Sequence, residues 1–166
     1  MKYKKYKLVK LSNFSGKIAS IYSVYIEDLK KTLFDVFLEE NKNSFKSELK
    51  DIVRRIRVIG HITGAREQFF KLNEGRPGDG VCALYDEDKK LRLYCIRYAK
   101  QLVIIGGGGE KSVQTLQEDE KLKKENFLLK EISKRITERI KEDEINYTND
   151  YMDFEGNLEF NTEDYE

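Results

Sequence analysis

The chain has 166 residues, which is close to the usual size of one domain and long enough to bury a hydrophobic core. With 39% hydrophobic residues, ten tyrosines and nine phenylalanines, its composition excludes a disordered chain. No window approaches about 18 uninterrupted apolar residues, and no apolar signal core follows the basic N-terminus. We therefore expect neither a membrane span nor export.

Two cysteines, Cys82 and Cys95, lie inside apolar runs. They lack the spaced partners of a zinc site or of a disulfide framework, which predicts buried thiols in a reducing compartment. We therefore expect a cytoplasmic protein that holds no metal and no cofactor.

The net charge of +1 hides an uneven distribution. Residues 1–115 hold 23 Lys and Arg against 14 Asp and Glu, whereas residues 116–166 hold 8 against 16. A basic body attracts phosphates and an acidic end can screen that attraction, so a nucleic-acid partner is compatible with these charges. Ordinary solvated faces would explain the same counts equally well.

The first half of the chain predicts one strand and then helices. Residues 3–11 alternate lysine with apolar residues, which is typical of an edge strand with one wet face. The segment 23–40 is ambiguous, although its second part has the apolar spacing of a helix. From 45 to 59 one apolar stripe opposes a basic one and predicts a clear helix, and Gly60 and Gly64 both suit the left-handed backbone that often ends a helix.

The middle of the chain changes to a strand pattern. Short apolar runs follow one another at 69–72, 81–85, 91–98 and 102–105. The last three predict an antiparallel meander, with a polar turn at 86–90. The segment 73–80 contains the only proline and three glycines, so we expect a shaped loop that leads into the meander. Four glycines, Gly106 to Gly109, are expected to end the last strand.

The C-terminal part is predicted to be one long helix and a tail. Apolar residues from Leu116 to Ile140 mark a charged helix. We assign residues 1–145 to a single domain and residues 146–166 to an acidic tail that could add a short strand pair. The predicted fold class is α+β, with an antiparallel or mixed twisted sheet of about 4–5 strands, an N-terminal helical pair and a long C-terminal helix.

Residues 44–119 carry a resemblance to a known family. Helices, a short strand, a glycine-rich loop, three strands and a lysine-bearing loop that enters a helix follow in this order. Gly80 opens the first strand of the meander, Arg92 follows an apolar residue in the next, and Lys111 follows the last. This pattern resembles the RelE/HigB toxin superfamily, including its phage-derived Gp49-like members, in which a glycine, an arginine and lysines stand at such positions.

The resemblance implies the toxin of a type II toxin–antitoxin pair. Such a protein would enter the ribosomal A site, cut messenger RNA without a metal ion, and be neutralised by a small antitoxin, often of the helix-turn-helix type. Relatives often carry a histidine where this chain has glycine, and the only histidine, His61, lies far upstream and is most simply a helix-end residue. A non-catalytic protein that binds a partner protein or nucleic acid therefore remains the alternative, and the oligomeric state stays open.

RNA cleavage by the substrate's own 2′-hydroxyl needs a group that removes its proton, cations for the phosphate and an acid for the leaving oxygen. Arg92, Arg97 and Lys111 are the predicted catalytic cations, and Arg76 and Tyr98 the predicted RNA-binding side chains. Strand alternation places Arg92 and Tyr98 on one face and Arg97 on the other. Each could instead be a solvated cation or a packed core tyrosine.

The glycine run also resembles a phosphate-binding loop, because bare backbone amides near a helix N-terminus attract anions. It is not a Walker A motif, since Glu110 separates the last glycine from Lys111, and this spacing argues against a nucleotide hydrolase. Gly107 and Gly108 are predicted either to let an RNA backbone approach closely or to permit a tight exit from a central strand.

Overall fold

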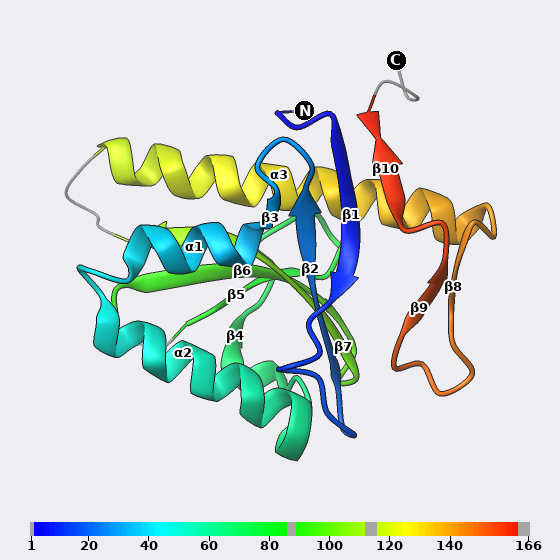
Figure 1. Cartoon of the computed structure of the whole chain (residues 1–166), viewed down its shortest axis with the longest axis horizontal. Coiled ribbons are helices and arrows are strands. Elements are labelled where there is room, and N and C mark those ends of the chain that lie inside the picture. Colours follow the sequence, from blue (N-terminus) through cyan, green and yellow to red (C-terminus); the bar gives the residue numbers. More distant parts are fainter. Residues whose placement is uncertain (1, 86–88, 112–115, 163–166) are drawn as a thin grey trace.

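The structure, a computed structural model, describes residues 2–85, 89–111 and 116–162 (Figure 1). The centre of the predicted turn at 86–90 and the loop that enters the last helix lie outside these ranges. Within them, α-helices cover α1 (Leu33–Asn41), α2 (Lys46–Val58) and α3 (Leu116–Lys141). A π-helical turn at Ile59–Thr63 and a 3-10 turn at Glu67–Phe69 lie between α2 and the central strands.

One mixed sheet of eight strands organises the chain, in the order β10-β1-β2-β7-β6-β5-β4, with β3 pairing with β2. Its strands are β1 (Lys5–Lys10), β2 (Ser20–Ile26), β3 (Lys31–Thr32), β4 (Phe70–Lys71), β5 (Val81–Leu84), β6 (Leu91–Tyr98), β7 (Leu102–Glu110) and β10 (Glu159–Asn161). The pair β2·β7 is parallel and the other pairs are antiparallel. The connection from β2 to β7 carries α1, α2 and the meander.

The predicted fold class was wrong in its details. The expectation of a RelE-like sheet of about 4–5 strands behind an N-terminal helical pair does not fit, because eight strands form the sheet and three of them, β1, β2 and β3, precede α1. Strand β2 was missed because six of its seven residues are buried, so it lacks the alternation that marks a half-exposed strand. Strand β1 is not an edge, since β10 pairs with it over Lys5–Lys7.

Helices cover both faces of the sheet, as Figure 1 shows. On one face, Phe34 and Phe37 of α1 and Ile56 of α2 pack against alternate residues of β6 and β7. On the other face, Leu129 and Ile132 of α3 pack against the intervening residues of the same strands. Two hydrophobic cores therefore form, one on each side of a shared sheet.

Local chemistry accounts for the start of α1 and for the end of the π-helical turn that follows α2. Thr32 caps α1, since its hydroxyl accepts a hydrogen bond from the backbone N–H of Asp35 and the Asp35 carboxylate accepts one from the Thr32 N–H. The predicted helix at 45–59 is confirmed as α2. Gly64 has φ 76° and closes the π-helical turn, whereas Gly60 lies inside that turn, where a Cβ would collide with the Phe14 carbonyl.

The glycine run continues a strand, which corrects the expectation that it would end one. Strand β7 runs through all four glycines to Glu110. A Cβ on Gly106 would press into the Leu129 side chain, and a Cβ on Gly107 would collide with the carboxylate of Glu125. These glycines therefore let α3 lie directly on the sheet.

The C-terminal segment returns to the sheet after α3. A second sheet pairs β8 (Ile145–Tyr147) with β9 (Phe154–Gly156), and β10 then joins β1. Arg139 of α3 stabilises this return, because its guanidinium donates hydrogen bonds to the carbonyls of Asn157 and Glu159 and lies over the Phe160 ring. Residues 163–166, the last part of the predicted acidic tail, lie outside the described residues.

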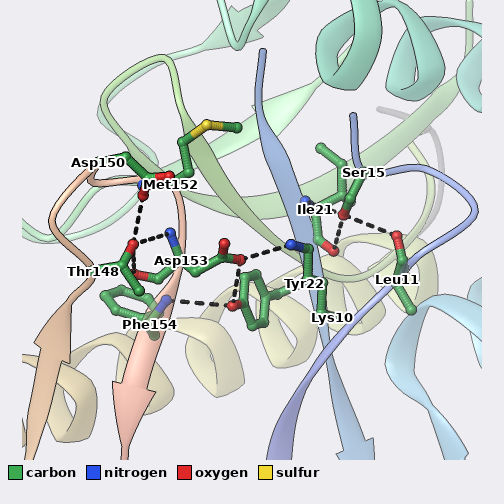
Figure 2. A network of polar contacts seen from close by, with 10 residues as sticks. All are labelled: Lys10, Leu11, Ser15, Ile21, Tyr22, Thr148, Asp150, Met152, Asp153 and Phe154. Carbon is green, nitrogen blue, oxygen red and sulfur yellow. Dashed lines mark hydrogen bonds and ion pairs between the residues drawn. The ribbon is translucent and has the colours of Figure 1, made fainter. Parts of the chain in front are cut away.

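A polar network attaches the β8–β9 hairpin to β1 and β2, and Figure 2 shows its members. The Asp153 carboxylate accepts a hydrogen bond of 2.9 Å from the Tyr22 hydroxyl and lies 3.0 Å from the Lys10 ammonium. The Phe154 N–H donates to the Tyr22 oxygen at 3.3 Å. Burial first, and then the bond to Asp153, raises the pKa of Tyr22, so this phenol stays neutral and serves as a structural donor.

Candidate nucleic-acid interface

A cationic groove lies between α3 and the β4–β6 half of the sheet. Its volume is about 500 Å³. The described residues that line it are Lys71, Glu74, Arg92, Tyr94, Lys111, Leu122, Lys123, Asn126, Phe127 and Lys130, and we call this the β6–α3 groove. Five of these side chains are cations and one is a carboxylate, so the groove favours an anionic ligand.

Strand register explains why three of these side chains face α3. Lys71 of β4 stands opposite Ala83 of β5, which stands opposite Tyr94 of β6. Cross-strand partners share a face, and Ala83 and Tyr94 both belong to the core under α3. Arg92 lies two residues before Tyr94 on the same strand and so points to the same side.

Helix α3 supplies the opposite wall. Lys123, Asn126, Phe127 and Lys130 follow the i, i+3, i+4, i+7 spacing of one helix face, while Leu129 and Ile132 face the core. Phe127 is 54% exposed at the rim of the groove. One wall therefore carries both cations and an exposed aromatic ring.

The 73–80 loop closes one end of the groove and is fixed to α3 at three points. The Asn126 amide donates to the Glu74 carbonyl at 2.8 Å, and the Ser133 hydroxyl donates to the Asp79 carbonyl at 2.7 Å. Arg76 pairs with Glu131 at 3.2 Å. Because the buried Ser133 hydroxyl holds the Asp79 carbonyl, the position of the 73–80 loop is fixed against α3.

Arg92 and Lys111, two of the predicted catalytic cations, meet in this groove. The Arg92 Nη1 donates to the carbonyls of Lys89 and Leu91 at 3.2 and 3.1 Å, and its guanidinium lies 5.0 Å from the centre of the Tyr85 ring. Lys111 is exposed directly after β7, and its N–H donates to the Lys90 carbonyl at 2.7 Å. One cation is thus held by the fold and the other extends into solvent.

Glu74 and Tyr94 add acid–base groups that the sequence did not indicate. Among the described side chains that line the groove, Glu74 is the only carboxylate, and its Oε1 lies 3.6 Å from the Lys71 ammonium. Burial first, and then the charge of Glu74, raises the pKa of Tyr94 to about 12. Near neutral pH, Tyr94 is therefore a hydrogen-bond donor, and Glu74 contributes carboxylate oxygens to the same groove.

Three predicted site residues lie elsewhere. Arg97 points to the opposite face of the sheet, as strand alternation predicted, and its Nε donates to the Ala65 carbonyl at 2.7 Å. Arg76 pairs with Glu131 of α3 and does not line the groove. Tyr98 packs edge to face against Phe154 with ring centres 5.0 Å apart, and its buried hydroxyl has no hydrogen-bond partner among the described residues. Tyr98 is therefore a packing residue.

Gly107 and Gly108 do not line the groove either. Gly107 lies beneath Glu125 of α3, and Gly108 lies against the Arg92 carbonyl. Their lack of a side chain serves packing between β6, β7 and α3, which favours the structural explanation for the glycine run.

His61 and the cysteines are also remote from the groove. His61 is exposed on the π-helical turn after α2. Cys82 and Cys95 are buried free thiols that stand opposite each other on β5 and β6, and burial raises the pKa of Cys82 to about 12. Their predicted state as buried thiols is confirmed.

A second basic hollow lies on the other helical layer. It is about 660 Å³ in volume and follows α2. Its described lining consists of Lys42, Asn43, Lys46, Leu49, Lys50, Val53, Arg54 and Arg57, which we call the α2 basic surface. It contains no aromatic side chain and no carboxylate within that lining, so it lacks the mixed chemistry of the β6–α3 groove.

Comparisons with protein-family models, with curated proteins and with solved structures find no match for this chain. None of the described helices combines the length and apolar character that crossing a membrane requires.

Proposed function

We propose that this chain binds single-stranded RNA in the β6–α3 groove and cleaves it, as the toxin of a toxin–antitoxin pair in the cytoplasm. The observation that carries the proposal is the meeting of Arg92 and Lys111 in one groove with Glu74. The sequence resemblance to RelE/HigB toxins supports the same activity only through the positions of Arg92 and Lys111, because the sheet that carries them is not RelE-like.

The groove chemistry favours single-stranded RNA over a duplex. Its cations suit a phosphate backbone, and Phe127 offers an exposed aromatic ring of the kind that unstacked bases contact. Messenger RNA on a ribosome offers such unpaired nucleotides. A small antitoxin would inhibit the protein by covering the groove.

The proposed reaction is an internal transesterification. The 2′-oxygen attacks the adjacent phosphorus and the bond from phosphorus to the 5′-oxygen breaks, which leaves a 2′,3′-cyclic phosphate and a free 5′-hydroxyl. The Glu74 carboxylate accepts the 2′-hydroxyl proton, and the Lys111 ammonium supplies a proton to the leaving 5′-oxygen. Arg92 stabilises the charge that gathers on the phosphate oxygens. No oxidant or further reactant is needed.

Inducible expression tests the proposal. Native protein should arrest growth and produce cut messenger RNA with 2′,3′-cyclic phosphate ends. At matched levels of folded protein, Lys111→Ala and Glu74→Gln should each lower cleavage about 10²–10⁴-fold, the usual contribution of a positioned acid or base. Arg92→Ala should lower it about 10²–10³-fold, the usual loss when a group that stabilises charge in the transition state is removed. Lys50→Ala on α2 is the matched control and should cleave like the native chain. Healthy growth with abundant folded native protein and intact messenger RNA would contradict the proposal.

Binding without chemistry is the second candidate, and the position of His61 favours it. The chain has one histidine, and it lies on the far helical layer. The groove therefore lacks the side chain whose ordinary pKa best suits proton transfer near neutral pH. Under this alternative, purified protein would bind RNA in a manner that depends on Arg92 and Lys111 but would leave it uncut on ribosomes.

A further inference from the structure

A second hollow adjoins the β6–α3 groove across Phe127. It is about 560 Å³ in volume, and its described lining includes Lys2, Tyr3, Lys123, Lys124, Phe127 and Leu128. Lys123 and Phe127 line both hollows. Phe127 therefore stands between two hollows that share part of their lining on α3.

A single exposed aromatic residue is common on protein surfaces and needs no explanation by itself. The setting of Phe127 is what differs. Three lysines, Lys123, Lys124 and Lys130, lie within four residues of it along α3. Leu122 and Leu128 are buried nearby on the same helix. The only carboxylate in the described lining of this second hollow, Glu125, is occupied by Lys121 at 3.4 Å. The result is an apolar platform within a cationic rim.

From these contacts we infer that Phe127 is a stacking platform for an unpaired base, and that the hollow beside it, with Tyr3 at its far side, holds the next nucleotide. This inference rests on the proposed function and adds to it a base-binding subsite. Base–aromatic stacking beside a positive groove is how proteins hold single strands without reading their sequence. Lys123 and Lys130 are about 10 Å apart along α3, the rise of about three stacked nucleotides.

The absence of tryptophan from the chain makes a direct test possible. Phe127→Trp introduces a single indole at the proposed platform. The probe is a short 2′-O-methyl oligouridine, which keeps bases and phosphates but lacks the attacking 2′-hydroxyl and so stays uncut. Saturating probe should quench the indole fluorescence. Tyr151→Trp, at a position 62% exposed on the β8–β9 hairpin, is the control and should show no quenching.

A second variant makes the test quantitative. Phe127→Ala should weaken binding of the same probe about 5–150-fold, because stacking on an aromatic side chain contributes about 1–3 kcal/mol per base. Tyr151→Ala should bind like the native chain. Unchanged indole emission at saturation, unchanged affinity of Phe127→Ala, or no binding of the probe by the native chain would each overturn the inference. Emission that shifts with anionic lipid vesicles but not with the probe would overturn it in favour of a membrane surface.

The outcomes separate this inference from the endonuclease proposal. Quenching by the uncut probe without cleavage of natural RNA would support the stacking platform and contradict the nuclease. Cleavage that depends on Arg92 and Lys111 but not on Phe127 would support the nuclease and contradict the platform.

Discussion

Gly108 of β7 lies so close to the backbone carbonyl of Arg92 in β6 that a Cβ at this glycine would overlap the carbonyl oxygen. The register of β6 against β7 shifts between Leu93 and Cys95. On the Arg92 side of this shift, Leu93 pairs with Gly108 and Arg92 pairs with Gly109. The close approach of the two strands lies at the position from which Arg92 enters the groove.

We expect Gly108→Ala to destabilise the protein by about 1–3 kcal/mol or more, because the new methyl group must displace the backbone of a central strand. Gly109→Ala is the matched control. A Cβ at Gly109 would meet Lys121 Cε at 3.3 Å, and that flexible side chain can move. Urea denaturation of both variants measures the difference. Equal stability of the two variants would show that β6 and β7 can separate here without cost.

Tyr98→Phe should leave stability unchanged or raise it by about 1 kcal/mol. The Tyr98 hydroxyl is buried and lacks a hydrogen-bond partner in the described part of the chain, so its removal ends an uncompensated desolvation cost. Tyr98→Ala, which also removes the ring packed on Phe154, should cost about 3–5 kcal/mol. Thermal and urea unfolding would measure both effects. If Tyr98→Phe instead lost RNA cleavage while keeping native stability, the Tyr98 hydroxyl would have a role in RNA binding or cleavage.

The spacing of apolar residues predicted the elements that have one buried face and one solvent-exposed face. The stripe of α2 and the alternation of β1 could be recognised because solvent imposes a period on them, whereas β6 was recognised from its apolar run between turns. The alternation of side chains along a strand correctly separated Arg92 from Arg97. Strand β2 is buried on both faces and the glycines of β7 have no side chains, so neither presents such a period. Their identity depends on tertiary packing.

The groove was harder to predict than the sheet. Arg92 and Lys111 were named from the sequence, but Glu74, Lys123 and Phe127 were not. Glu74 is brought into the groove by the Asn126 hydrogen bond to its carbonyl, a contact between residues 52 positions apart. Such long-range contacts leave no local signal. The lysine spacing around Phe127 was a signal that could have indicated a cationic face of α3.

Asp153 should make folding depend on pH below about 4. Burial opposes ionisation of this carboxyl, but the hydrogen bonds from Lys10 and Tyr22 outweigh it and lower the pKa of Asp153 below its usual value. The stabilisation is therefore complete above the unfolded pKa and is lost as the pH falls through the lower folded pKa. Asp153→Asn should flatten this part of the stability profile in urea denaturation. Glu155→Gln, exposed on β9, should leave it unchanged; parallel profiles for native and Asp153→Asn protein would contradict the assignment.

Glu125 should make the folded protein less stable as the pH rises, which is opposite to the effect of Asp153. Burial on α3 raises the pKa of Glu125, although the Lys121 charge partly opposes this. A raised pKa means that folding loses stability as the pH rises through the folded value. We therefore expect Glu125→Gln to be more stable than the native chain at pH 7, with a difference that shrinks toward pH 4. Glu120→Gln, an exposed neighbour on α3, is the control in the same denaturation series. Lower stability of Glu125→Gln at pH 7 would show that pairing with Lys121 outweighs burial.

The two basic surfaces can be distinguished by the salt dependence of RNA binding. Each phosphate that a single strand places against a cation contributes about −0.7 to the slope of log K against log salt. If RNA lies in the β6–α3 groove, the double variant Lys123→Ala and Lys130→Ala should reduce the slope by about 1.4.

Lys50→Ala combined with Arg54→Ala, which removes the same number of charges from the α2 basic surface, should leave the slope unchanged. Fluorescence anisotropy of a labelled 2′-O-methyl oligouridine between low and moderate salt would give all three slopes. Because both double variants change the net charge equally, a difference between them cannot arise from long-range attraction alone. A reduced slope only in the α2 variant would place the RNA on the opposite face of the sheet and remove the groove from the proposed function.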